Sequence, residues 1–126
     1  MKRHVHRELG FTLVEIMIVI GIIGLLAAIA IPNFIKARAT SQQNACINNL
    51  RQINSAVEQW AMETGQAPGA PPPDMGTELT PYIQLNSNSS IPLCPSGGTY
   101  TIYNISAVPQ VSCSLSTLAS NPHIFQ

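Results

Sequence analysis

The stretch that decides the fold is Phe11–Ile31, FTLVEIMIVIGIIGLLAAIAI, in which 17 of 21 residues are apolar. As an α-helix it would extend roughly 31 Å at about 1.5 Å per residue, enough to cross a hydrocarbon core of about 30 Å. Lys2, Arg3 and Arg7 precede the run, and basic, apolar and polar blocks in this order are typical of a membrane-insertion signal. We therefore expect a single membrane pass with the amino terminus in the cytoplasm.

Glu15 is the one ionisable residue inside this apolar segment. Insertion of an acidic side chain at mid-membrane depth costs about 2.5 to 3.5 kcal/mol, and the cost falls toward the end of the helix. One interpretation is that Glu15 only reaches back to the interface. The other is that it has a cationic partner, which must be a terminal ammonium or belong to another chain, because no Lys or Arg lies one helical turn away.

Composition excludes several classes of function. The 126 residues carry six Lys/Arg against six Asp/Glu, with no basic cluster, so we expect no nucleic-acid contact. Residues 79–126 contain no Asp, Glu, Lys or Arg, so they cannot supply a carboxylate pair or a Ser-His-Asp triad. We predict that the protein is not an enzyme and needs no cofactor.

The residues around the start of the apolar run resemble a known family. Gly10-Phe11-Thr12-Leu13-Val14-Glu15, followed by the apolar run and Pro32-Asn33, is similar to the amino terminus of type IV pilins and of the pseudopilins of type II secretion systems. The resemblance covers about 30 of the 126 residues. It implies a pilin-like α+β fold, a long helix whose second half packs on a small antiparallel sheet.

The resemblance also implies a processing route and a set of partners. A prepilin peptidase would cut the leader 1–10 after Gly10 and methylate the new amine of Phe11. Glu15 would then act in assembly, meeting the amine of a neighbouring subunit. The implied partners are copies of the chain in a homo-oligomeric filament, related minor pilins, the peptidase and an inner-membrane assembly platform. The protein would lie in the inner membrane with a periplasmic head before it joins a periplasmic pseudopilus or a surface pilus, and the short head favours the pseudopilus.

Pro32 follows the apolar run directly. It lacks a backbone N–H and clashes with the preceding turn, so we expect a kink or a locally melted stretch there.

A conventional signal peptide is the main alternative. Ala28-Ile29-Ala30 satisfies the small-x-small rule for signal peptidase, and cleavage there would release a soluble periplasmic binding module beginning at Ile31. Against it, the apolar run is longer than a usual signal core and Glu15 interrupts it.

The second half of the helix is predicted over residues 37–64. Its core-facing positions step by three and four, and they are Cys46, Leu50, Ile53, Val57, Trp60 and Thr64, widened by Ala56 and Ala61. Gly65 suits the end of this helix. The predicted divisions are thus a leader 1–10, a transmembrane and assembly segment 11–31, and a head 32–126.

The remaining head residues are predicted to form loops and β-structure. Residues 67–76 are rich in proline and glycine and cannot continue the helix, and a short helical turn capped by Thr77 is expected over residues 77–83. Alternation predicts strands at Thr99–Ile105 and Val108–Ser114, with a turn over residues 96–98.

The chain has three cysteines, so a disulfide between any two of them leaves the third as a free thiol. Outside the cytoplasm we predict a Cys94–Cys113 disulfide, with Cys46 as a small apolar residue on the helix stripe. We predict no metal site, because no two cysteines have CxxC spacing and His123 has no ligand partner in the sequence. Asp74 and Glu78 alone are weak evidence for calcium, which needs six to eight oxygens.

Overall fold

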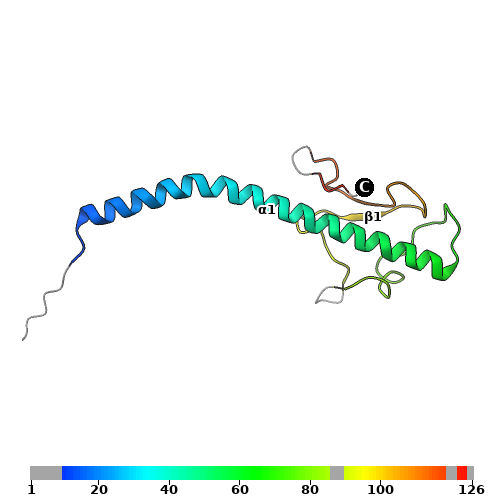
Figure 1. The fold of residues 1–126 in the computed structure, drawn as a ribbon. Helices are drawn as coiled ribbons and strands as arrows, with labels where there is room; N and C mark the ends of the chain where they lie inside the picture. Colours follow the sequence, from blue (N-terminus) through cyan, green and yellow to red (C-terminus); the bar gives the residue numbers. More distant parts are fainter. Residues whose placement is uncertain (1–9, 86–89, 119–121, 125–126) are drawn as a thin grey trace, which may run out of the picture. The chain divides into compact units, whose positions relative to one another are not determined.

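The computed structural model describes residues 10–85, 90–118 and 122–124. Residues 1–9, which are the leader without Gly10, therefore lie outside the described part. The chain divides by its internal contacts into two compact units, one ending at Ala37 and one beginning at Arg38. The elements in chain order are α1 (Leu13–Thr64), β1 (Tyr100–Ile102) and β2 (Val111–Cys113), a long amino-terminal helix and a small antiparallel sheet (Figure 1).

Residues next to each end of α1 form hydrogen bonds with the free backbone groups of its terminal turns. At the start, the backbone N–H of Glu15 donates to Oγ1 of Thr12 at 3.2 Å, so Thr12 satisfies one of the free N–H groups of the first turn. At the end, Gly65 has φ of +65°, and the N–H of Gln66 donates to the carbonyl of Ala61 at 2.9 Å. This is the glycine-terminated cap that the sequence predicts.

Pro32 lies inside α1, and every residue of Leu13–Thr64 is helical. The locally melted stretch considered above is therefore not present in this structure. One proline removes one main-chain hydrogen bond and destabilises a helix by about 3 kcal/mol. The helical turns on either side of Pro32 remain formed despite this cost. The kink at Pro32 stays a prediction.

The core of the head forms against one face of α1. The buried helix residues are those of the predicted stripe except Ala61, which is partly buried, and Thr64, namely Cys46, Leu50, Ile53, Ala56, Val57 and Trp60. Thr64 is exposed, and its hydroxyl donates to the carbonyl of Trp60 at 2.6 Å instead of packing inward. Residues from the rest of the head complete the core, namely Leu79, Ile83, Cys94, Ile105, Val111 and Cys113.

The two strands pair antiparallel, with Tyr100 opposite Cys113 and Ile102 opposite Val111. Both strands are shorter than the sequence analysis predicts. Pro109 has no N–H to donate, and Ser106 adopts a left-handed φ of 68°, so the chain between the strands turns before regular pairing begins. The pairing places Val111 and Cys113 in the core, beside the helix stripe.

The loop over residues 74–82 contains one helical turn, closed by the hydrogen bond from the N–H of Glu78 to the carbonyl of Asp74 at 3.0 Å, and this turn begins three residues before the predicted one. Its cap is Asp74 and not Thr77, because Oδ1 of Asp74 accepts hydrogen bonds from the N–H groups of Gly76 and Thr77 and from the Thr77 hydroxyl, each at 2.9 Å. An aspartate that accepts hydrogen bonds from the backbone two and three residues ahead acts as the N-cap of that turn. The carboxylate of Glu78 in turn accepts a hydrogen bond from the backbone N–H of Asp74 at 2.6 Å.

Candidate functional site: the exposed amino-terminal helix

The first half of α1 exposes a continuous apolar surface. Phe11, with 78% of its side chain exposed, and fifteen further large apolar side chains up to Ile35 are uncovered. This part of α1 is long and apolar enough to cross a membrane, and none of its most apolar window is buried inside the protein. An apolar surface of this size exceeds what soluble monomers usually expose, so it is a candidate for contact with lipid or with other helices.

The predicted processing residues lie at the beginning of this surface. Gly10, Phe11 and Thr12 precede the first helical residue, are not part of any element and are exposed. A protease needs an unfolded stretch of backbone, and these residues provide one immediately before α1. A Cβ added to Gly10 would meet no atom within 4 Å, so the fold itself does not require glycine there.

Glu15 lies on the first turn of α1 and is exposed among the apolar side chains. Its backbone N–H is held by Thr12, whereas no hydrogen bond or ion pair of its carboxylate is found within residues 10–85, 90–118 and 122–124. A carboxylate in such an apolar setting needs a cationic partner if it is to leave water. The geometry therefore leaves the carboxylate free to receive a partner from another molecule.

The candidate calcium residues Asp74 and Glu78 are used within their own loop. Hydrogen bonds from the Thr77 hydroxyl, and then from the N–H groups of Thr77 and Gly76, hold the pKa of the Asp74 carboxyl below its usual value. Because both carboxylates already accept from the loop backbone, their structural role as caps accounts for the two acidic residues.

The three cysteines lie together in the head. All three are buried free thiols in this structure, so the predicted Cys94–Cys113 disulfide is not formed in it, and the pairing stays a prediction. Burial raises the pKa of the Cys46 thiol to about 12. Burial acts in the same direction on Cys94, but hydrogen bonds from the N–H groups of Ser96 and Gly98 and from the neighbouring thiols outweigh it and lower the pKa of the Cys94 thiol.

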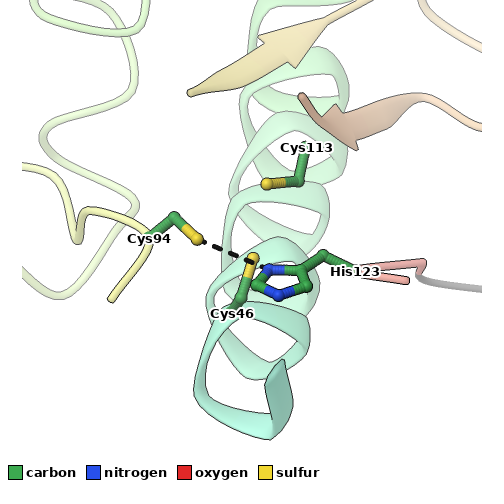
Figure 2. Close-up of side chains that lie close together, drawn as sticks. All are labelled: Cys46, Cys94, Cys113 and His123. Atoms are coloured by element: carbon green, nitrogen blue, oxygen red, sulfur yellow. Dashed lines mark hydrogen bonds between the residues drawn. The ribbon is translucent and has the colours of Figure 1, made fainter. Parts of the chain in front are cut away.

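Sequence reasoning missed a fourth member of this group. His123 is only 2% exposed, and its Nδ1 lies 3.5 Å from Sγ of Cys94 (Figure 2). Nothing in the sequence pairs His123 with the cysteines, since it lies ten positions after Cys113 and no motif spacing links them. The signal that remains in the sequence is a lone histidine in a segment without charged residues.

Comparison with known proteins bears on the amino-terminal segment. The family model of the prokaryotic N-terminal methylation motif matches residues 5–31. The type IV major pilin protein PilA of Myxococcus xanthus is 53% identical over 57 residues, which cover 45% of this chain and 26% of the pilin. The type IV major fimbrial protein FimA of Dichelobacter nodosus is 43% identical over 58 residues, 46% of this chain and 37% of that protein.

A secretion protein is matched as well. The type II secretion system core protein G of Pectobacterium carotovorum is 30% identical over 63 residues, which cover 50% of this chain and 40% of that protein. The matches thus span well under half the length of these relatives. No solved structure matches the chain. The similarity to type IV pilins and to a pseudopilin that the sequence analysis stated is confirmed, and it covers at most half of this chain.

Proposed function

We propose that the chain is a structural subunit of a type IV pilus-like filament, or of the related pseudopilus of type II secretion, assembled through its apolar amino-terminal helix. The observation that carries the proposal is the uncovered apolar half of α1 with a single carboxylate near its start. The methylation motif over residues 5–31 supports it. A helix of this kind can be buried in a bilayer or against copies of itself packed around a common axis, because both surroundings remove it from water.

Processing supplies the missing cation in this proposal. Prepilin peptidase would cut between Gly10 and Phe11 and methylate the new amine, which carries a positive charge four residues before Glu15. In the filament the amine of an incoming subunit would meet the Glu15 carboxylate of its neighbour. A buried ion pair adds little net stability because desolvation offsets the Coulomb attraction, whereas an unpaired buried charge costs about 3 to 5 kcal/mol. The pair therefore selects the one stagger between subunits in which both charges are satisfied.

Topology follows from the charges before the helix. Lys2, Arg3 and Arg7 favour a cytoplasmic amino terminus, which would place the head in the periplasm before assembly. The membrane pass would hold the subunit ready for an inner-membrane assembly platform. The higher identity with the pilins supports the pilus over the pseudopilus: it is 53% and 43% over the matched residues with the pilins but 30% with the secretion protein.

The dependence of assembly on the peptidase tests the proposal. The full chain is produced in a bacterium that has a type IV pilus assembly system, with and without its prepilin peptidase gene, and the sheared filament fraction is probed for the chain. We expect the chain in that fraction only when the peptidase is present. Gly10→Val should remove it from the fraction in the presence of the peptidase, because a branched side chain replaces the small residue at the cut.

The control is Met62→Ala, which lies outside the leader and the apolar run and replaces a side chain that is 74% exposed. This variant should be processed and assembled like the parent. Equal amounts of chain in filaments with and without the peptidase would refute the proposal.

A further inference from the structure

Four side chains with metal-binding atoms meet in the core of the head. Sγ of Cys46, Cys94 and Cys113 and a ring nitrogen of His123 all lie within 4.8 Å of one another, and all four residues are buried. Figure 2 shows the three sulfurs and the imidazole turned toward a common point from four separate segments of the chain. We propose that they form a Cys₃His site that binds one Zn²⁺ ion, a site that does not depend on the filament function proposed above.

The spacing of the four atoms fits tetrahedral zinc. With Zn–S of about 2.3 Å and Zn–N of about 2.0 Å, a tetrahedral site has S···S edges of about 3.8 Å and S···N edges of about 3.5 Å. The Cys94 Sγ to His123 Nδ1 distance is 3.5 Å, which equals that second edge. The other atoms are within 4.8 Å, so a contraction of at most about 1.0 Å along an S···S edge and about 1.3 Å along an S···N edge brings them to their zinc-bound spacing.

Hydrogen-bond donors face two of the three sulfurs. The N–H groups of Ser96 and Gly98 hydrogen bond to Sγ of Cys94, and the hydroxyl of Tyr100 lies 3.5 Å from Sγ of Cys46 and donates to it. Asn49 in turn donates to the Tyr100 oxygen at 3.1 Å, which orients that hydroxyl. Hydrogen-bond donors around the sulfurs are the outer-shell partners that metal-binding thiolates require.

Gly98 allows the loop to approach the sulfur of Cys113. A Cβ at this position would lie 2.7 Å from Sγ of Cys113, closer than any side chain tolerates, and 3.0 Å from Cγ of Leu115. The absence of a side chain thus lets one backbone segment present an N–H to Cys94 while it passes directly against the sulfur of Cys113.

His123 is held in place by contacts of its own. The side-chain amide of Gln43 on α1 donates to the carbonyl of Pro122 at 2.7 Å, and the N–H of His123 donates to the carbonyl of Leu115 at 3.2 Å. The carboxyl-terminal segment is therefore anchored on both the helix and the turn after β2, which directs the imidazole inward.

A disulfide accounts for this cluster less completely. Any one disulfide uses two of the sulfurs and leaves a third buried thiol and a buried imidazole beside it. A zinc ion uses all four groups, with three protons released to solvent as the thiols become thiolates. Zinc would also join α1, the loop at Cys94, β2 and the carboxyl-terminal segment, in a head whose only strands within the described residues are three residues each. A small domain with a limited core is where a structural metal contributes most.

The test uses the full chain, exported with its membrane helix and purified in detergent without chelator or reductant. We expect one zinc ion per chain by inductively coupled plasma mass spectrometry and three reduced cysteines by intact mass. His123→Ala and Cys113→Ser should each weaken zinc binding by more than roughly 100-fold, above the effect of losing an outer-shell partner. Ser112→Ala, which changes the neighbouring residue whose hydroxyl contacts exposed Tyr103, should keep the zinc.

A second measurement covers the case in which a ligand variant fails to fold. Replacing zinc by Co²⁺ in the unsubstituted chain should produce the visible absorption of tetrahedral cobalt together with thiolate-to-cobalt charge transfer. A chain that is metal-free and carries a Cys94–Cys113 disulfide would overturn the proposal, as would one that is metal-free with reduced thiols and gives no cobalt absorption. Retention of full zinc occupancy in both ligand variants would overturn it too, because the ion would then be bound elsewhere.

Discussion

Glu15→Leu should leave insertion into the membrane intact and abolish filament formation. Leucine is more soluble in lipid than glutamate, so the helix inserts at least as well. In the assembled filament, however, the amine of the incoming Phe11 would have no carboxylate to meet. Burying that unpaired charge costs about 3 kcal/mol or more, which lowers the assembly constant roughly 100-fold per subunit. Filaments add many subunits in sequence, so the yield should fall below detection.

Membrane fractionation and the sheared filament fraction measure the two outcomes separately. Val14→Leu is the matched control, since it changes the adjacent exposed apolar residue without touching a charge. It should insert and assemble like the parent. If Glu15→Leu gives the parent's filament yield, the carboxylate only reaches back to the interface and has no role in assembly.

Leu50→Ala should destabilise the head by about 2 to 5 kcal/mol, since truncating a fully buried leucine removes apolar contacts and leaves a cavity. Leu50 is 0% exposed and lies at the centre of the helix stripe, next to Cys46 and Ile53 along the core face. Domains of this size have about 5 to 15 kcal/mol of total stability, so the loss is a large part of it.

Urea unfolding of the detergent-solubilised chain measures this effect through the fluorescence of Trp60, which is the only tryptophan and is buried in the same core. Met62→Ala on the same helix is the control, because Met62 is 74% exposed and its loss should change the free energy of unfolding by no more than about 0.5 kcal/mol. Equal unfolding midpoints for the two variants would show that the stripe is not the core of the head.

The helix and its core face could be predicted from the sequence because both follow from local periodicity. The stripe from Cys46 to Trp60 is buried as predicted, whereas Ala61 is only partly buried and Thr64 is exposed, because the Thr64 hydroxyl donates to a carbonyl one turn back on the helix. The cap at Gly65 was predictable for the same reason. Helical spacing needs no knowledge of the remainder of the chain.

The strands and the thiol cluster depend on contacts that are distant in sequence. Alternation placed both strands correctly but overestimated their lengths, because the turn at Ser106 and the missing N–H of Pro109 end the pairing. The cluster joins Cys46, Cys94, Cys113 and His123, which are 48, 19 and 10 positions apart. Only the folding of the loop, β2 and the carboxyl-terminal segment against α1 brings them together. Spacing rules for metal sites recognise ligands that lie close in sequence and cannot detect this arrangement.

The mature amino terminus of the native polypeptide tests the central claim most directly. The claim is that α1 is retained and exposed for assembly, which requires processing immediately before it. Mass spectrometry of the amino-terminal peptide from the membrane and filament fractions should find a chain that begins at Phe11 with a methylated amine. A chain that begins at Ile31 and is recovered in the soluble periplasmic fraction would contradict the account, because the apolar half of α1 would then be a discarded signal peptide.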